Sequence, residues 1–461
     1  MTKTLRLFYY FIALCPFINQ AQIHFSPFVE KATGSWPETV AIGDMNNDGL
    51  NDVVLGTSSY SSTNDWKILV FLQNTNGTLS PYTDYSYMPA GHAPTMDIAD
   101  LNQDGLKDVV IAADNTICIF YQNSNGTLNP MTTISTSQLV SSLKCADINN
   151  DSKTDFAVAF IDSNYVSTYI QGTAGNFTAQ NYPLPNTMSI DELEIGDINN
   201  DSKKDIVCVS VSPSGIYSLK QNATNGFNTS VYTTILGITG IDIGDLNGDG
   251  KTDVAYTKYG NTPLSKIGLL YQNTSSQLYN SAIELSAYDG AELIEIADLN
   301  NDGKNEIIVA HGGWENASVY QKNSSNVFSS YSLFPIPISD HYNLQGMAVG
   351  DINHDGKKDI VVADVNRGLI ILYSTTTLDI NENSSKASVV VYPNPTTNYL
   401  SIENKNNLEL SYEITDTNGK ILQNDILNRN SHIDVSQLQA GFYFITIRNE
   451  FEKTTYKFIK N

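Results

Sequence analysis

Seven acidic strings of nine residues recur along the chain, and each carries the oxygen atoms that a hard cation prefers. The strings begin at Asp44, Asp100, Asp147, Asp197, Asp245, Asp298 and Asp351, at intervals of 47–56 residues. Ca²⁺ takes roughly six to eight oxygen ligands. A loop of this length offers side-chain oxygens from positions 1, 3, 5 and 9 and a backbone carbonyl from position 7. The pattern therefore predicts up to seven structural calcium sites.

Each predicted site combines acidic side chains at positions 1, 5 and 9 with an Asn at position 3 and the carbonyl of residue 7. In chain order the predicted ligands are Asp44, Asn46, Asp48, Leu50, Asp52, Asp100, Asn102, Asp104, Leu106, Asp108, Asp147, Asn149, Asp151, Lys153, Asp155, Asp197, Asn199, Asp201, Lys203, Asp205, Asp245, Asn247, Asp249, Lys251, Asp253, Asp298, Asn300, Asp302, Lys304, Glu306, Asp351, Asn353, Asp355, Lys357 and Asp359.

The sixth position of each string must turn with a positive φ, which glycine adopts freely. Glycine occupies it in five strings, whereas Ser152 and Ser202 occupy it in the other two, where we expect weaker binding. Glu306 replaces the final Asp of the sixth string and has the reach to chelate with both oxygens. Mg²⁺ prefers a stricter octahedron, and Zn²⁺ prefers Cys or His, of which only His354 lies in a string. The alternative is a set of Asx turns without an ion.

Strands must position these loops. Each string follows an apolar residue and a small one, such as Ile42-Gly43, and precedes a β-branched run, such as Val53-Val54, which predicts strand, tight loop and strand. A polar turn between apolar segments follows and predicts a hairpin, so each repeat contains about four strands. Repeats of ~50 residues with four antiparallel strands are typical of propeller blades. We therefore predict an all-β chain, a seven-bladed β-propeller with a calcium loop in each blade, followed by a small β-sandwich.

Two further details of the propeller follow from the pattern. The seventh repeat lacks its last strand, and Gln22 to Val29 resembles that strand. We predict that this segment completes the last blade and joins the two ends of the ring, which removes an exposed edge. The small residue before each string predicts crowding where the inner strands converge on the axis.

Composition limits the classes of partner. The net charge of −23, from 49 Asp and Glu against 26 Lys and Arg, argues against nucleic acid, which needs basic residues that displace counterions. Residues 1–21 predict a secretory signal peptide, and the alternative is a buried N-terminal element. No later segment is apolar enough for a transmembrane span. Cys118, Cys145 and Cys208 lie in apolar runs and predict buried thiols rather than a disulfide framework.

The repeats resemble the calcium-binding blades of FG-GAP and VCBS-type proteins, the propeller family that includes the heads of integrin α-subunits. The resemblance covers about residues 22–376, and we assign residues 22–374 to the propeller. It implies the fold and bound calcium. The literal Phe-Gly and Gly-Ala-Pro tags are absent, with Gly91-His92-Ala93-Pro94 as the nearest approach, so integrin-like ligand recognition is not implied.

The tail has a different pattern. Residues 375–387 are polar and predict a linker, and residues 388–461 contain about seven short strand segments, which suit a small β-sandwich. The tail is similar to the type A sorting domain of the type IX secretion system. The matching strings are Tyr392-Pro393-Asn394-Pro395, Asp416 with Gly419-Lys420, Leu438 with Gly441-Phe442-Tyr443, and Lys457-Phe458-Ile459-Lys460. This resemblance implies the type IX secretion machinery as a partner and a location outside a Gram-negative cell, secreted or at its outer surface. The alternative is a carbohydrate-binding sandwich.

No catalytic constellation is evident. His311-Gly312-Gly313-Trp314 is similar to an oxyanion-hole string, but no Gly-x-Ser-x-Gly elbow accompanies it, so a turn is expected. Carboxylates upstream of the strings predict solvated strand faces, although a pair for glycoside cleavage is the open alternative; they are Glu192, Glu194, Asp242, Glu292 and Glu295. The aromatic residues that could stack on sugars are Tyr60, Trp66, Tyr87, Trp314 and Tyr342.

We therefore expect a secreted or cell-surface calcium-binding propeller without catalytic activity, for binding or adhesion to glycan or protein. The alternative is a polysaccharide lyase or glycoside hydrolase on the same scaffold, and a third reading is a purely structural module. An enzyme predicts a deep pocket with converging basic and acidic groups outside the acidic strings. A binding protein predicts shallow aromatic patches.

Overall fold

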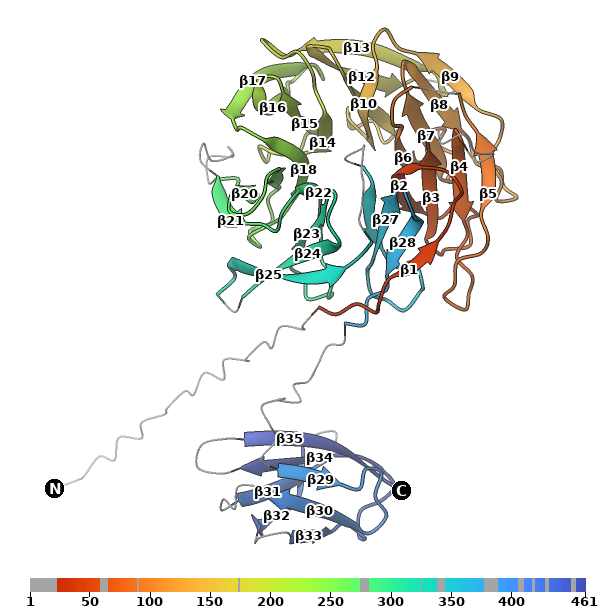
Figure 1. Cartoon of the computed structure of the whole chain (residues 1–461). Coiled ribbons are helices and arrows are strands. Elements are labelled where there is room, and N and C mark those ends of the chain that lie inside the picture. Colours follow the sequence, from red (N-terminus) through yellow and green to blue (C-terminus); the bar gives the residue numbers. More distant parts are fainter. Residues whose placement is uncertain are drawn as a thin grey trace, which may run out of the picture. The chain divides into compact units, whose positions relative to one another are not determined.

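The computed structural model divides into two compact units, Gln20–Leu378 and, in the C-terminal part of the chain, Asp379–Asn461 (Figure 1). The structure describes residues 23–58, 65–88, 91–172, 175–273, 282–323, 325–337, 345–376, 389–404, 410–416, 419–427, 431–448 and 453–461.

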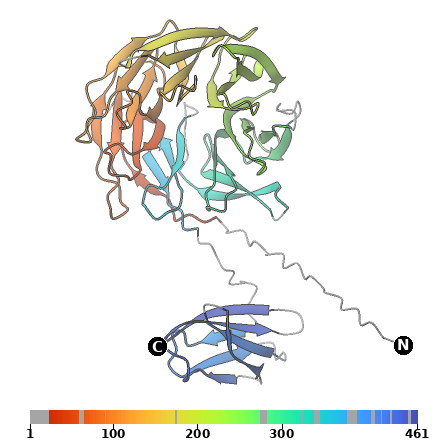
Figure 2. The ribbon, with the colours of Figure 1, turned by 180° about the vertical axis from the view of Figure 1, so that it is seen from behind.

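The first unit consists of seven four-stranded antiparallel sheets arranged like propeller blades around a common axis, as Figure 1 and the view from behind in Figure 2 show. Blades 1 to 3 are β2 (Pro37–Gly43), β3 (Asp52–Thr57), β4 (Lys67–Phe71) and β5 (Thr83–Ser86); β6 (Thr95–Ala99), β7 (Asp108–Ala113), β8 (Thr116–Phe120) and β9 (Thr132–Ser135); and β10 (Val140–Ala146), β11 (Asp155–Phe160), β12 (Tyr165–Gln171) and β13 (Phe177–Pro183).

Blades 4 to 7 repeat this order, and the last blade takes its outer strand from the other end of the unit. They are β14 (Glu192–Gly196), β15 (Asp205–Val211), β16 (Ser214–Gln221) and β17 (Phe227–Thr234); β18 (Ile238–Gly244), β19 (Asp253–Lys258), β20 (Lys266–Leu270) and β21 (Ile283–Ser286); β22 (Ala291–Ala297), β23 (Glu306–His311), β24 (Asn316–Lys322) and β25 (Phe328–Pro335); and β26 (Met347–Gly350), β27 (Asp359–Asp364), β28 (Gly368–Leu372) and β1 (Val29–Lys31).

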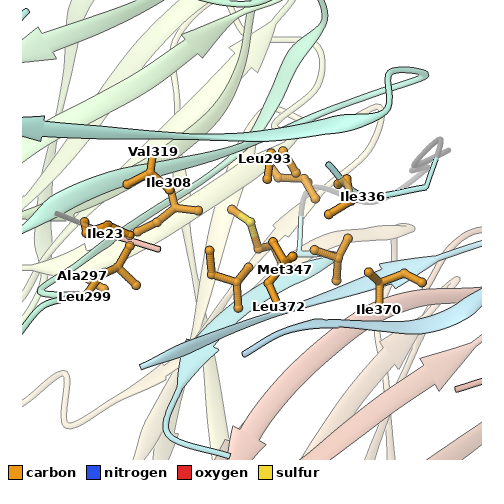
Figure 3. Close-up of a cluster of buried hydrophobic side chains, with 14 residues drawn as sticks. Ile23, Leu293, Ala297, Leu299, Ile308, Val319, Ile336, Met347, Ile370 and Leu372 are labelled. Carbon is orange, nitrogen blue, oxygen red and sulfur yellow. The ribbon is translucent and has the colours of Figure 1, made fainter. Parts of the chain in front are cut away.

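The N-terminal strand completes the seventh blade, as the sequence predicted. Val29 in β1 pairs with Ile371 in β28, and a further bridge joins Phe25 to Ser374. The regular strand begins at the last residue of the predicted segment, because only an isolated bridge forms before it. The described segment also places Ile23 in the apolar core between blades 6 and 7 (Figure 3). The two ends of the ring are therefore held by both backbone pairing and side-chain packing.

The apolar core of the propeller lies between neighbouring blades. Seven clusters of buried side chains each combine residues from two adjacent sheets, including one that joins blade 7 to blade 1 through Ile352 and Val53. The second strand of each blade is buried over almost its whole length, for example all six residues of β3, because sheets cover both of its faces. This explains the β-branched run after each acidic string.

The small residue before each acidic string allows neighbouring inner strands to approach. A Cβ atom on Gly43 would lie 2.8 Å from Cγ2 of Ile98 in the next blade, and one on Gly196 would lie 2.4 Å from Cδ1 of Ile243. The predicted crowding of the inner strands is confirmed. Its cause is the apolar residue two positions before the following string, which packs against the small one.

Gln345 lies before β26 and connects blade 7 to three other blades. Its backbone carbonyl accepts a hydrogen bond from Val40 in blade 1 (3.1 Å). Its side-chain oxygen accepts from the hydroxyl of Thr95 in blade 2, and its Nε2 donates to Oγ of Ser142 in blade 3 (3.2 Å). The backbone and side chain of this one buried residue thus supply polar contacts to three other blades.

Antiparallel order gives the propeller two distinct faces. The acidic strings join the first and second strands, so they lie on the same face as the hairpins between the third and fourth strands. We call this the loop face. The turns between the second and third strands, and the connections between blades, lie on the opposite face, which we call the far face.

The second unit contains the seven tail strands that the sequence predicted, in two sheets with one shared core. The sheets are β29 (Val389–Tyr392), β30 (Tyr399–Asn404) and β33 (Ser431–Asp434), and β32 (Ile421–Leu427), β31 (Leu410–Thr415), β34 (Gly441–Arg448) and β35 (Lys453–Lys460). Leu400 and Ile433 of the first sheet pack with Ile414 and Ile445 of the second. Asn394 donates to the carbonyl of Lys457 and accepts from the N–H of Ile459, both at 2.9 Å, so it ties the first tail string to the last.

Among the described residues the cysteines are free; Cys118 and Cys208 are buried, as predicted, whereas Cys145, which was also predicted to be buried, is only partly buried. No helix in the described part of the chain has the length and apolar character needed to cross a membrane.

Candidate functional site

Each acidic string occupies the same place in its blade. The first strand ends at the residue before position 1, and position 9 is the first residue of the second strand in all seven blades. In loop 1, for example, β2 ends at Gly43 and β3 begins at Asp52. Each loop therefore connects the first strand of its blade to the second and brings positions 1, 5 and 9 within electrostatic range of one another.

The first three polar positions of a loop hold the turn through backbone N–H groups. In loop 1 the carboxylate of Asp44 accepts from the N–H of Asp48 (3.1 Å) and of Gly49 (2.8 Å). Asn46 Oδ1 accepts from Asp48 N–H (3.0 Å), and Asp48 Oδ1 accepts from Leu50 N–H (2.9 Å). This pattern recurs with small variations in the other six loops. The oxygens proposed as ligands are thereby oriented toward the inside of the turn.

Position 6 has a positive φ in every loop, as the sequence predicted. The φ values are +84° at Gly49 and +67° and +66° at Ser152 and Ser202, the two positions without glycine. Position 4 also has a positive φ throughout, for example +59° at Asn47 and at His354. The sequence analysis missed this second left-handed position, although Asn, which fills it in four loops, tolerates that conformation better than most residues.

Position 9 is buried in all seven loops. The Asp52 carboxylate is fully buried and accepts two hydrogen bonds, from Met45 N–H and from Gln73 N–H, both at 2.7 Å. Burial raises the pKa of Asp52 to about 6, the two hydrogen bonds oppose this shift, and the carboxylates of Asp48 and Asp44 add to it. The three acidic side chains of one loop therefore act on one another at short range.

The same electrostatic situation recurs around the ring. Burial, followed by the acidic neighbours at positions 5 and 1, raises the pKa of Asp108, Asp205 and Asp253 to about 6. The pKa of Asp155 is also raised, mainly by burial. That of Asp359 rises to about 7 and that of Glu306 to about 8. A divalent cation within a loop would offset this repulsion and favour the ionised carboxylates.

The donor set of the loops fits Ca²⁺. Each loop offers hard oxygen atoms and no thiolate, and the buried Oδ2 of Asp205 in loop 4 has no hydrogen-bond partner among the described residues. In this structure the carboxylates lie against their own backbone N–H groups, and no three His, Cys, Asp or Glu side chains within the described ranges already form a metal cluster. Within the described residues, four of the five lysines at position 7 pair with the position-5 carboxylates, as Lys153 does with Asp151 (3.4 Å).

In five of the blades a glutamine at or just after the end of the third strand connects the loop to the loop of the preceding blade, which was not predicted from the sequence. Gln122 N–H donates to Asp108 of its own loop (2.8 Å), and Gln122 Nε2 donates to the carbonyl of Asp44 in the loop before it (3.2 Å). The equivalent residues are Gln73, Gln171, Gln221 and Gln272. The sequence feature that could have predicted this connection is the recurrence of Gln before Asn or Gly at the start of the hairpin turn.

Charged side chains also gather near the axis, which corrects the expectation of solvated strand faces. Glu192 is buried and accepts from Ile241 N–H of the next blade (2.7 Å). Lys144 forms an ion pair with Glu194 (2.6 Å), and Glu295 also acts on it. Asp242 accepts from Ile296 N–H (2.6 Å). Burial raises the pKa of Glu295 to about 7, although Lys144 opposes this shift.

The far face carries an exposed aromatic residue beside a groove. Trp314 is 37% exposed and makes an edge contact with Tyr288, with ring centroids 6.0 Å apart. Its neighbour Glu315 lines a groove of about 670 Å³ on blades 6 and 7. The other lining residues are Phe28, Pro335, Ile336, Pro337, Asn366 and Arg367.

The other aromatic candidates do not form such a surface. Tyr87 is buried and donates to the carbonyl of Thr57, and Trp66 packs against Tyr87 in the core between blades 1 and 2. Tyr60 and Tyr342 lie outside the described residues.

The repeats define the class of protein. Five segments match a family model described as an FG-GAP-like repeat, at residues 44–111, 100–158, 147–208, 197–256 and 270–362, of which the first four overlap. These matches cover more than half of the chain, which therefore belongs to the FG-GAP-like repeat proteins and has a propeller-like fold.

The tail adds the particular feature of this chain. Residues 390–461 match a secretion system C-terminal sorting domain. The protein is therefore an FG-GAP-like repeat protein with a type IX sorting domain, exported to the cell surface or extracellular space of a Gram-negative bacterium.

Comparison with solved structures shows the fold alone. BBS1N, in a crystal structure of its complex with ARL6DN, is 12% identical over 78% of this chain and 100% of that chain, with a TM-score of 0.52. An Agrocybe aegerita lectin that recognises non-reducing terminal N-acetylglucosamine is 15% identical over 76% of this chain and 87% of that chain, with a TM-score of 0.49. No curated protein sequence matches the chain.

Proposed function

We propose that this protein is a secreted or cell-surface calcium-binding propeller without catalytic activity, which binds glycan through the far face of blades 6 and 7. Calcium ions bind in the acidic loops and stabilise the loop face, and the ligand site lies on the far face. The observation that carries the calcium part is the burial of the position-9 acid in all seven loops, within reach of two further carboxylates. Clustered like charges at the start of buried strands favour a cation at neutral pH.

The groove beside Trp314 supports the binding part. Its volume of about 670 Å³ falls in the range of small-molecule sites, roughly 300–1,000 Å³. Phe28 lines the groove, and the partly exposed Trp314 directly precedes the lining residue Glu315, so both rings are available to pack on the C–H face of a sugar ring. Glu315, Asn366 and Arg367 offer hydrogen-bond groups for hydroxyls. This combination of flat apolar and planar polar groups suits an extracellular glycan better than an apolar ligand.

A calcium titration tests the scaffold. Metal-stripped protein should unfold at a lower temperature than wild-type protein in excess calcium, since binding to the folded state alone stabilises it. Thermal unfolding with and without chelator measures the difference. An unchanged unfolding temperature, with no ions bound in equilibrium dialysis, would refute the calcium part.

A glycan array tests the ligand site. The wild-type chain in calcium should bind a subset of glycans, and the substitutions Trp314→Ala and Arg367→Ala should each weaken binding at least about tenfold, as expected for residues that supply most of the contact energy. Tyr259→Ala, which removes an exposed aromatic of blade 5, is the matched control. Equal binding by all three variants would place the ligand elsewhere.

The charged groups near the axis favour one second candidate, a glycoside hydrolase or polysaccharide lyase. Lys144 and the carboxylates of Glu194, Asp242 and Glu295 provide the convergence of basic and acidic groups that such an enzyme needs. Asp242, like Glu192 nearby, accepts a hydrogen bond from a backbone N–H of the next blade, so a structural role accounts for its position. Release of reducing ends or unsaturated products from array-positive glycans would identify the enzyme, and Glu295→Gln should then abolish it.

A further inference from the structure

The most exposed apolar side chains of the propeller gather on the far face of blades 4 and 5. Leu236 is 77% exposed, Leu264 73% and Met188 69%, whereas no other large apolar side chain among the described residues is more than 62% exposed. Val211, in the turn of blade 4, is 50% exposed. We call Met188, Val211, Leu236 and Leu264 the aliphatic patch. Apolar side chains that gather on a surface in this way mark an interaction site.

Backbone hydrogen bonds join the turns that carry the aliphatic patch. Met188, in the connection between blades 3 and 4, donates its N–H to the carbonyl of Ser212 (2.8 Å). Ser212 directly follows Val211, the last residue of β15, and a bridge between Ser189 and Ser212 extends the pairing. Met188 and Val211 therefore belong to one surface, at the far-face ends of strands drawn in green in Figure 1.

Leu236, in the connection between blades 4 and 5, continues this surface into blade 5. The residue before it donates its N–H to the carbonyl of Ser214 (3.1 Å), in the same turn of blade 4. The residue after it accepts a hydrogen bond from Tyr259 N–H (2.9 Å), in the turn between β19 and β20 that also contains Leu264. The four aliphatic residues thus lie along one continuous arc of turns.

The turns of the aliphatic patch carry no charge, although the chain is strongly acidic. They comprise residues 186–190, 211–215, 235–241 and 259–265, which contain no Asp, Glu, Lys, Arg or His. The whole chain has a net charge of −23, and the acidic strings lie on the opposite face. Two copies of such a chain repel each other over most of their surface. The uncharged patch is therefore the place where a second copy can approach.

The aliphatic patch also has the size that a dimer interface needs. Its exposed side chains offer on the order of 500 Å² of apolar surface, near the upper end of the ~300–600 Å² that the largest patch on a monomer covers. A standard interface buries about 800 Å² on each partner, of which about 57% is apolar, or about 450 Å². One patch therefore supplies the apolar part of such an interface.

We propose that two copies of this chain associate through their aliphatic patches, with far face against far face. A two-fold axis places the same four residues on both sides of the contact, so each side chain contributes twice. The acidic loops then point away from the contact in both copies. None of the four residues lines the groove beside Trp314, and the inference goes beyond the proposed function.

Sedimentation analysis of the full chain in calcium buffer tests the proposal. We expect wild type to reach twice the chain mass with a Kd in the micromolar range. Leu236→Glu replaces an apolar contact by a negative charge on both sides of the two-fold axis, and should weaken association at least about 100-fold. Leu264→Ser adds no charge and should weaken association at least about tenfold, as expected for a contact at the centre of an interface.

Val327→Glu is the matched control. Val327 is 55% exposed but lies in the hairpin between β24 and β25, on the loop face. The substitution adds the same charge to an exposed aliphatic position and should leave the association constant within about twofold of wild type. The far-ultraviolet circular dichroism of all three variants should match that of wild type, which separates loss of association from loss of the fold.

Ionic strength gives a second, independent measurement. Association through an uncharged patch works against the mutual repulsion of two chains of charge −23. Screening of that repulsion should strengthen the wild-type dimer as NaCl rises from about 0.05 M to about 0.5 M at constant calcium. An interface made of ion pairs would respond in the opposite direction.

A wild type that stays monomeric up to about 100 µM would overturn the proposal. Dissociation of the dimer by NaCl, or equal effects of Leu236→Glu and Val327→Glu, would overturn it as well. A monomeric wild type that binds phosphatidylcholine vesicles would refute the dimer and assign the aliphatic patch to a lipid surface. All these outcomes are distinct from a failure of the proposed function, which is measured by the loss of glycan binding in Trp314→Ala.

Discussion

The side-chain Nε2 of Gln122 donates a hydrogen bond of 3.2 Å to the backbone carbonyl of Asp44, the first residue of the acidic loop in the preceding blade. The backbone N–H of the same glutamine donates to Asp108 of its own loop (2.8 Å). One residue thus connects two loops, and its equivalents repeat the connection in four other blades. The glutamines therefore link loops 7, 1, 2, 3, 4 and 5 in series.

Replacement of Gln122 by Leu should therefore destabilise the propeller more than a surface change does. The substitution removes the donor to the partly buried carbonyls of Asp44 and Lys107, and an unsatisfied buried group costs about 1–3 kcal/mol. Chemical denaturation in excess calcium measures the free energy of unfolding. Gln180→Leu, on the exposed outer strand β13, is the control and should be close to neutral. Equal effects of the two substitutions would show that the connection between loops contributes nothing.

The pH dependence of stability should reverse sign when calcium is removed. Without metal, burial raises the folded-state pKa of Asp52 from 3.8 to about 6. The folded chain then binds protons more readily than the unfolded chain, so stability should increase as the pH falls from about 7.5 to about 5.5. With calcium bound, protons compete with the ion for the same carboxylates, and stability should decrease over that range.

Thermal unfolding at three pH values, in metal-free buffer and in excess calcium, measures whether stability rises or falls with pH under each condition. Asp52→Asn supplies a control, since it keeps the shape of the side chain and should reduce the metal-free pH dependence. Curves of the same slope in both buffers would contradict the presence of calcium in these loops.

Position 6 offers a prediction about strain. Ser152 has a φ of +67°, a conformation that costs an L-residue roughly 1–2 kcal/mol. Ser152→Gly should therefore stabilise the chain by about 1 kcal/mol and tighten calcium binding in loop 3. Gly105→Ser, at φ +85° in loop 2 with open space around its Cα, should have the opposite effect of similar size. Denaturation and calcium titration of both variants check the pair, and shifts of the same sign would rule out backbone strain as the cause.

Gln345 should be among the most sensitive polar residues of the propeller. Its amide serves Thr95 and Ser142 in two different blades. Gln345→Leu keeps the volume but removes both contacts, and should lower the free energy of unfolding by about 2–4 kcal/mol, since several buried groups lose partners together. Gln423→Leu, at a half-buried site in the tail, is a control that should leave the propeller transition unchanged. A propeller transition in Gln345→Leu that matches wild type would show that these contacts are dispensable.

Much of the fold could be predicted from the sequence because the same pattern recurs in seven repeats. The strings fixed the position of each tight turn, and the β-branched runs after them marked strands such as β3 and β27, which are buried on both faces. The N-terminal strand could be assigned because the last repeat lacked one. The positive φ at Ser152 and Ser202 followed from the turn that glycine makes elsewhere.

Contacts between repeats were harder to predict, because the sequence pattern of one blade does not show which residues of the next blade it will contact. The glutamine connections, the role of Gln345 and the gathering of Lys144 with Glu194 all depend on the closed ring. Nothing in the sequence distinguished Trp314 from the other four aromatic residues considered for sugar binding. Only the packing separated it from Tyr87, which lies inside the core.

The pairing of β1 with β28 has a consequence for the order of folding. His24 and Thr376, at the same junction, are 352 positions apart in the chain. Closing so long a span costs conformational entropy before any contact compensates it, and long-range strand pairing is slow for that reason. Strand pairing in the other six blades is local in sequence, but the ring closes only when blade 7 has formed. A chain truncated before residue 368 would therefore keep an unpaired, aggregation-prone strand edge.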